Sequence, residues 1–314
     1  MSTIIPFIAA PGYRFTTQWV EVLQQVLPEC TVVPVEFLST EQRALVQVAV
    51  VANPDPQTLR LLPNLKWVHS VWAGVERLLS HLQDWQLPVV RLKDPELART
   101  MAEAVLAWSM YLHRDMPAYR QLQTERRWQP LDYIPARARR IGVLGAGALG
   151  GAAMKLLQQT GFQVAGWSRS GNGPEGISCF SGEQGLQELV TQTDILVLLL
   201  PLTPQTRGLV NAALLKKLPA GAALINFARG DIVNDADLRT VIDSGHLRHA
   251  VLDVFSQEPL PPQSWHWSHP SVTVLPHISA PTSRDTAAQI VAENLRRWLA
   301  SGVMPETVDL QQGY

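Results

Sequence analysis

The stretch Ile141-Gly142-Val143-Leu144-Gly145-Ala146-Gly147-Ala148-Leu149-Gly150 decides the fold that this sequence predicts. An aliphatic run leads into the pattern G-x-G-x-x-G, and an alanine-rich helical pattern follows it. In such a turn one glycine makes the sharp bend, one lets backbone approach a pyrophosphate, and one lets the helix pack on the strand. The N–H groups at the helix start then bind phosphate. The expected dinucleotide contacts are Gly145, Gly147, Ala148, Leu149 and Gly150.

The sequence after the glycines supports this interpretation and indicates the coenzyme. Gln163–Trp167 is a second strand pattern, placed where a βαβ unit needs one. An NAD site has Asp or Glu about 20 residues beyond the glycines. Here Arg169 stands 19 positions after Gly150 (150 to 169), between Ser168 and Ser170. A solvated turn with an incidental arginine is the alternative, but we expect these three residues to bind a 2′-phosphate, which favours NADP(H) with NAD(H) possible.

The composition excludes several classes of protein. The chain has 314 residues, of which 46% are hydrophobic, and its formal net charge is -1. That length predicts two domains, and the charge favours neither nucleic acid nor an anionic membrane surface. The longest apolar runs, such as Ile195–Leu200, are too short to span a bilayer. Cys30 and Cys179 lack metal or redox spacing. Without a secretory pattern at the N-terminus, we expect a cytoplasmic protein.

The first part of the chain alternates strand and helix patterns, which predicts a smaller parallel α/β sheet. A long, unusually apolar helix is expected from Pro95, over Leu97 to Leu112. It packs either against a second subunit or within its own chain, and we favour a homodimer. A final helix over Ser283–Leu299 follows the second sheet and is expected to return to the first domain. The predicted domains are 1–97 completed by 284–314, which binds substrate, and 98–283, which binds the dinucleotide.

Three strand ends each present one polar residue that suits the same reaction. They are Arg229 after one strand, Glu258 after the next and His277 after the last. Ligands of open α/β sheets bind outside the carboxyl ends of the strands. An arginine binds a carboxylate in bidentate fashion, a histidine exchanges a proton near neutral pH, and a carboxylate orients the imidazole. The set fits reduction of a 2-keto acid, although each residue alone is more often an ordinary turn or loop residue.

His266 and His269 raise the alternative of a metal site, because they lie three residues apart. Neither has a carboxylate or cysteine close by in the sequence. We therefore interpret them as loop histidines and expect no metal.

With these residues in place, the chain resembles the D-isomer-specific 2-hydroxyacid dehydrogenases, and most of all their glyoxylate/hydroxypyruvate reductases. The resemblance runs nearly from end to end. It is carried by Gly145, Gly147, Gly150, Leu200–Gly208, Asn226–Gly230, Asp253–Pro259 and Pro276–His277. It implies an α/β fold in which a Rossmann domain is inserted in a smaller flavodoxin-like parallel domain.

The resemblance also implies roles for single residues. Arg229 would bind and polarise the substrate, His277 would be the general acid/base, and Glu258 would pair with His277. Asp253 would lie on the nicotinamide side of the coenzyme site. The remaining implied contacts are Leu200, Pro201 and Ala228 for the coenzyme, and Trp72, Ala73, Gly74 and Arg229 for the substrate. The family loop usually continues Gly-Val-Asp, whereas this chain has Glu76 after Gly74-Val75.

The expected activity is NADPH-dependent reduction of glyoxylate, hydroxypyruvate or a similar small 2-keto acid. The alternatives are a nucleotide-sensing, corepressor-like binding protein and a dehydrogenase of the same family with another 2-hydroxy acid substrate. The complete set of Arg229, Glu258 and His277 favours an enzyme.

Overall fold

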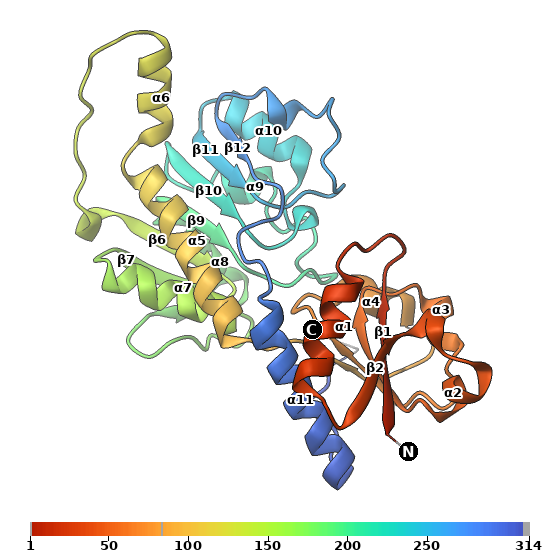
Figure 1. Cartoon of the computed structure of the whole chain (residues 1–314). Helices are drawn as coiled ribbons and strands as arrows, with labels where there is room; N and C mark the ends of the chain where they lie inside the picture. The colour runs from red at the N-terminus through yellow and green to blue at the C-terminus, as the bar shows by residue number, and fades with distance from the viewer. Residues whose placement is uncertain (1, 83, 310–314) are drawn as a thin grey trace. The chain divides into compact units, whose positions relative to one another are not determined.

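The computed structural model describes residues 2–82 and 84–309, which form two compact units (Figure 1). Unit 1 comprises residues 1–96 and 282–314, and unit 2 comprises residues 97–281. Unit 2 is therefore inserted in unit 1 along the chain. No helix among the described residues is long and apolar enough to cross a membrane.

Unit 1 is built on a five-stranded parallel sheet with the order β2-β1-β3-β4-β5, which is the flavodoxin-like order. Its strands are β1 Thr3–Ala9, β2 Cys30–Pro34, β3 Val48–Ala52, β4 Trp67–Ser70 and β5 Val89–Val90. Its helices are α1 Thr16–Val26, α2 Thr40–Leu45, α3 Pro56–Arg60, α4 Glu76–Leu82 and α11 Arg284–Ser301, with the 3-10 turn η1 Val35–Phe37. Every residue of β3 is buried, as expected of a central strand covered on both faces.

The two faces of this sheet have separate cores. One core joins β1 and β3 to α1 and α11 through residues such as Trp19, Leu23 and Val291. The other joins the sheet to α3 and α4 through residues such as Leu59 and Leu78. Helix α11 belongs to unit 1, so the last helix does return to the domain that begins the chain, as the sequence predicts.

Unit 2 is built on a seven-stranded parallel sheet with the order β12-β11-β10-β9-β6-β7-β8. This is the doubly wound dinucleotide-binding order with one further strand. Its strands are β6 Arg140–Leu144, β7 Gln163–Trp167, β8 Cys179–Phe180, β9 Ile195–Leu198, β10 Ala222–Asn226, β11 Leu247–Leu252 and β12 Val272–Val274. Its helices are α5 Pro95–His113, α6 Met116–Thr124, α7 Ala148–Gln159, α8 Gly182–Thr191, α9 Ala212–Leu215 and α10 Asp235–Asp243, with turns η2 Ala136–Ala138, η3 Gly230–Ile232 and η4 Trp265–Trp267.

The apolar helix α5 packs on the core of unit 2. Its residues Met101, Val105 and Leu112 are buried against the β6 and β9 side chains Ile141 and Ile195. Much of the apolar run that suggested a second subunit is therefore used within the chain.

The segment after α5 is different, because α6 and the loop 125–135 extend away from the sheet of unit 2 (Figure 1). Nearly every residue of 123–134 is exposed. The exposed side chains include Trp128, Tyr133 and Ile134, with Met116 and Tyr119 on α6. We call residues 114–135 the arm.

Candidate active site

The glycine turn after β6 has the geometry that a dinucleotide needs. Gly145 has a φ of +107°, and its N–H donates to the Trp167 carbonyl at 2.8 Å. A Cβ on Gly145 would lie 2.6 Å from the Leu199 oxygen, and one on Gly150 would lie 1.7 Å from the Gly145 oxygen. These two positions are too close-packed for a side chain, so strand, turn and helix meet directly.

Gly147 is not close-packed. A Cβ there would find no described atom within 4 Å, and the first turn of α7 receives no side-chain cap from the part of the chain described. The space beside Gly147 suits a pyrophosphate, because the free N–H groups and the positive end of the dipole of α7 are directed toward a ligand bound there. Ala148 and Leu149 open this helix.

The turn after β7 brings Arg169 to the edge beside the glycine turn, because β7 pairs with β6 and the Trp167 carbonyl holds Gly145. Ser168 donates its hydroxyl proton to the Asn172 carbonyl at 2.8 Å, and Ser170 Oγ accepts from the Asn172 N–H at 3.3 Å. Ser168 thus shapes the turn, whereas the Ser170 hydroxyl keeps its own proton for a ligand. Arg169 is exposed.

Two other expected coenzyme contacts also lie at strand ends. Leu200 and Pro201 follow β9, and the Pro201 carbonyl accepts from Thr206 Oγ1 at 2.7 Å. Leu200 and Ala228 are buried. These residues lie at the carboxyl edge of the sheet, as the motif positions predict.

Arg229 is held by a buried amide after β10. Asn226 is 1% exposed; its Nδ2 donates to the Arg229 carbonyl at 3.1 Å and its Oδ1 accepts from the Ala228 N–H at 3.1 Å. The guanidinium of Arg229 is half-buried, and Nη1 donates to the Ala228 carbonyl at 2.7 Å. Asn226 therefore fixes the turn from which Arg229 projects.

Glu258 and His277 form a hydrogen-bonded pair at the ends of the next two strands. Glu258 Oε2 accepts from His277 Nδ1 at 2.8 Å, and Oε1 accepts from the Phe255 N–H at 2.9 Å. The sequence predicts this pair, and the structure places its members together although they are 19 residues apart. His277 Nε2 has no partner among the described residues, so this nitrogen is available to exchange a proton with a substrate.

The turn that carries His277 depends on Asp253. His277 has a φ of +55°, a left-handed conformation that is uncommon for residues other than glycine. Its N–H donates to the Asp253 carbonyl at 3.0 Å. The Asp253 carboxylate, 2% exposed, accepts from the N–H groups of Ile278 at 2.7 Å and Ser279 at 2.9 Å. Asp253 is thus an anchor of the His277 turn, and its position beside a nicotinamide stays a prediction.

The charges of the pair reinforce each other. The hydrogen bond to Glu258 raises the pKa of His277 above its usual value, against the opposing effects of burial and of the Arg229 charge. Burial alone would raise the pKa of Glu258, but the hydrogen bonds from His277 and Phe255 outweigh it and leave that pKa low. Both shifts favour an imidazolium beside a carboxylate.

The expected substrate loop lies in unit 1, after β4. Ser70 Oγ accepts from the Trp72 N–H at 3.1 Å, so this N–H is already used. The next two N–H groups, of Ala73 and Gly74, meet no acceptor within the described ranges. Two adjacent free N–H groups are a geometry that binds a carboxylate.

His266 and His269 do not share a site. Each pairs instead with a different carboxylate of α10: His266 with Asp235 at 2.7 Å and His269 with Asp243 at 3.1 Å. In the described parts of the chain no group of three or more His, Cys, Asp or Glu is placed to hold a metal ion.

Sequence reasoning missed the side chains that hold the catalytic turns. Asn226 ends an otherwise apolar strand, and a buried amide in that position is a signal that could have been read. Ser70 gives a similar signal two residues before Trp72. The hydrogen bond from the Phe255 N–H to Glu258 could not be predicted, because every residue type except proline has a backbone N–H.

A dinucleotide fold whose carboxyl edge holds an arginine and a Glu–His pair defines a nicotinamide-dependent dehydrogenase. Residues 106–279 match the family described as D-isomer specific 2-hydroxyacid dehydrogenase, NAD binding domain. The chain therefore belongs to the D-isomer specific 2-hydroxyacid dehydrogenases, which are NAD(P)-dependent oxidoreductases.

Solved structures of similar proteins cover the whole chain. A D-isomer specific 2-hydroxyacid dehydrogenase from Xanthobacter autotrophicus, in complex with NADPH and MES, is 37% identical over 98% of this chain and 99% of that chain, with a TM-score of 0.91. An NADPH-dependent glyoxylate/hydroxypyruvate reductase from Sinorhizobium meliloti, in complex with NADP and sulfate, is 33% identical over 99% and 100%, with a TM-score of 0.87. These likenesses confirm the predicted family and fold.

The contrast between Gly147 and Gly150 yields a prediction. Gly150→Ala should destabilise the protein by about 1–3 kcal/mol, because its Cβ would strike the Gly145 carbonyl. Gly147→Ala should cost less than about 1 kcal/mol but weaken dinucleotide binding, since its Cβ would occupy the approach to the helix start. Denaturant unfolding and coenzyme titration would measure both. Unchanged coenzyme affinity in Gly147→Ala would place the pyrophosphate elsewhere.

The Glu258–His277 pair predicts the pH dependence of the reaction. Reduction needs protonated His277, so kcat/KM should be constant below the raised pKa of His277 and fall as pH rises through it. Glu258→Gln removes the charge that raises this pKa and should move the fall to lower pH by about one unit. Glu188→Gln, an exposed change on α8, is the control. The same midpoint in all three proteins would contradict the coupling.

Proposed function

We propose that this enzyme reduces glyoxylate, hydroxypyruvate or a similarly small 2-keto acid with NADPH. The observation that carries the reaction is the Glu258–His277 hydrogen bond, which leaves Nε2 of His277 facing no other group of the described chain. The relative from S. meliloti, named as a glyoxylate/hydroxypyruvate reductase, supports the substrate class.

In the proposed mechanism the chain's own residues bind the substrate and move the proton. Arg229 binds the substrate carboxylate and polarises the keto oxygen. The resemblance assigns the loop Trp72–Gly74 of unit 1 to substrate binding as well. The nicotinamide coenzyme, when bound, supplies the hydride to the keto carbon. His277 donates its Nε2 proton to the oxygen, which completes the hydroxyl group. Glu258 stabilises the imidazolium before the transfer and keeps Nδ1 protonated throughout.

The preference for NADPH rests on the turn after β7. Residues Ser168–Asn172 contain no carboxylate that would bond a ribose hydroxyl or repel a 2′-phosphate. Arg169 supplies a cation there, and the Ser170 hydroxyl has a proton to donate. The relatives from X. autotrophicus and S. meliloti are described in complex with NADPH and NADP, which agrees with this assignment.

The test combines substrate and coenzyme. With glyoxylate or hydroxypyruvate as substrate, the purified enzyme should oxidise NADPH with a higher kcat/KM than NADH. Arg169→Ala should raise the Kd for NADPH by about one to two decades, since a charge-assisted hydrogen bond contributes roughly 1.5–3 kcal/mol. Its Kd for NADH should barely change.

Lys155→Ala, which removes an exposed cation from α7, is the matched control and should leave both constants as they are. Wild-type preference for NADH, or equal weakening of both coenzymes by Arg169→Ala, would overturn the coenzyme assignment. Failure to turn over any small 2-keto acid would overturn the substrate class.

We further propose that the enzyme is a homodimer and that the arm contacts the second copy. Trp128 is fully exposed and Tyr133 is 69% exposed, within a stretch, 123–134, that is exposed almost throughout. Large aromatic side chains gathered in one exposed segment mark an interaction surface. A second copy is the occupant that would cover them in a purified enzyme.

The dimer has a direct test. Wild-type protein should have twice the chain mass by light scattering, and Trp128→Ser combined with Tyr133→Ser should shift it toward the monomer. Trp267→Ser removes another exposed tryptophan, outside the arm, and should leave the mass unchanged. A monomeric wild type, or a double variant that remains dimeric, would refute the arm as the interface.

A further inference from the structure

His266 is a polar side chain with no role in the reaction, and yet it is 5% exposed. Both of its ring nitrogens are used. Nδ1 lies 2.7 Å from Ser264 Oγ, and Nε2 lies 2.7 Å from Asp235 Oδ1. A buried imidazole with a hydrogen-bond partner on each nitrogen is held in one orientation.

The ring of His266 contacts two aromatic side chains. Trp265 stacks on it with centroids 4.0 Å apart, and Trp265 Nε1 also donates to Asp235 Oδ2 at 3.0 Å. Phe255 also contacts the imidazole in an edge-on arrangement, with centroids 5.2 Å apart. Asp235 therefore fixes both rings of the turn η4 to α10, and Phe255 rests against the fixed histidine.

Phe255 is also the residue whose N–H holds Glu258 Oε1 at 2.9 Å. Its other side is closed by Gly230, where a Cβ would lie 2.1 Å from the Phe255 carbonyl carbon. Phe255 thus approaches Gly230 closely through its backbone and contacts His266 through its ring. A displacement of its backbone would change the position of the Glu258 carboxylate and with it the 2.8 Å bond to His277.

We propose that Asp235 and His266 position the Glu258 carboxylate, acting through Phe255. They are positioning residues for the Glu258–His277 pair and touch neither substrate nor coenzyme. This inference rests on the roles proposed above for Glu258 and His277.

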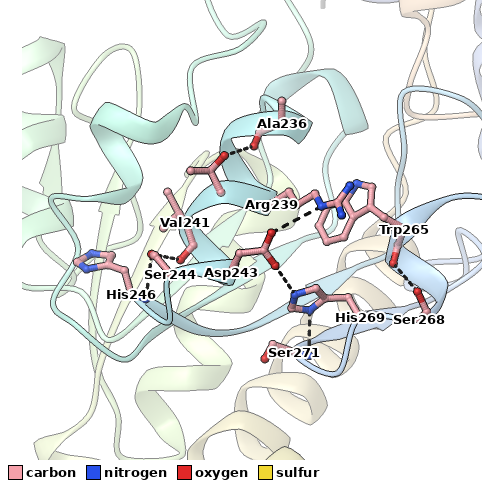
Figure 2. Close-up of polar contacts among 11 residues, drawn as sticks. Ala236, Arg239, Val241, Asp243, Ser244, His246, Trp265, Ser268, His269 and Ser271 are labelled. Carbon is pink, nitrogen blue, oxygen red and sulfur yellow. Dashed lines mark hydrogen bonds and ion pairs between the residues drawn. The ribbon is translucent and has the colours of Figure 1, made fainter.

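The neighbouring pair of His269 and Asp243 supplies an internal comparison. Figure 2 shows the Asp243 carboxylate between Arg239 and His269, at 3.7 Å and 3.1 Å respectively. His269 meets the outer ring, Trp265, with centroids 5.5 Å apart, and has no contact with Phe255 among those the structure describes. Both pairs attach η4 and its flank to α10, but only the His266 pair reaches the residue that holds Glu258.

The test compares His266→Phe with His269→Phe. His266→Phe keeps a ring between Trp265 and Phe255 but loses both hydrogen bonds. The groups that set the titration of His277 are Glu258, Arg229 and Asp253. If Glu258 loses its position, the raising effect weakens, so the titration midpoint of His277 should fall by at least about 0.5 pH unit. The midpoint is read by NMR of labelled histidine, assigned with His277→Ala, and by the pH profile of kcat/KM.

His269→Phe should lower thermal stability without moving the midpoint, because it weakens the attachment to α10 and leaves Phe255 in place. A wild-type midpoint in a folded His266→Phe protein would overturn the proposal, and a stability loss alone would mark His266 as structural. If His266→Phe does not fold, Ser264→Ala and Asp235→Asn each remove part of the bonding, and unchanged midpoints in both would overturn it equally.

The NMR readout separates this inference from the proposed function. A shifted His277 midpoint in an enzyme that reduces no keto acid would leave the positioning role standing and reject the function. Normal turnover of keto acids by the wild type, with an unchanged His277 midpoint in His266→Phe, would support the function and reject the positioning role.

Discussion

The turn that carries His277 depends on one buried carboxylate, that of Asp253. The backbone at His277 is left-handed, which costs roughly 1–2 kcal/mol for a residue with a Cβ. Two hydrogen bonds to the charged Asp253 oxygens, each contributing about 1.5–3 kcal/mol, offset that cost and select the conformation. The turn in this conformation directs Nδ1 of His277 to Glu258. An amide in place of Asp253 would offer only one acceptor to two donors, so the site needs an acid there for geometric reasons.

The order of the strands brings the other groups to this anchor. Arg229, Glu258 and His277 follow β10, β11 and β12, which are neighbours in a parallel sheet, so their carboxyl ends meet at one edge. Strand order alone does not fix the positions of the loops. The close approach of Gly230 to the Phe255 backbone constrains two of them, because no side chain fits between the two loops. The pairing of Glu258 with His277 is therefore a product of backbone packing as well as of side-chain chemistry.

Most of the framework could be predicted from the sequence, because buried parallel strands are continuous apolar runs. Gln163–Trp167 has the predicted bounds, and Ile195–Leu200 ends two residues early as β9. The two-residue edge strand β8 was missed, since so short a segment has no periodicity to detect. Arg229, Glu258 and His277 were placed at strand ends from the sequence, and the structure has them there, with Glu258 bonded to His277. Their roles in the reaction stay predictions. The partners of His266 and His269 were not predicted, because Asp235 and Asp243 lie on a helix about 30 residues earlier, and only the fold brings them close. The apolarity of α5 indicated burial correctly, but the pattern contains no information on which surface buries it.

The charge on His277 is set by opposing effects: Glu258 favours the protonated imidazole, whereas burial and the Arg229 charge disfavour it. Arg229 disfavours a second positive charge nearby, and partial burial disfavours it further. A carboxylate held in direct contact favours the imidazolium against these two effects, since Coulomb energy falls with distance. Phe255 serves this purpose with a hydrogen bond that stabilises the ionised form of Glu258 as well as its position. The structure thus ties one anion, Glu258, to the backbone beside two basic side chains, Arg229 and His277. Their roles in substrate binding and proton transfer are those proposed above.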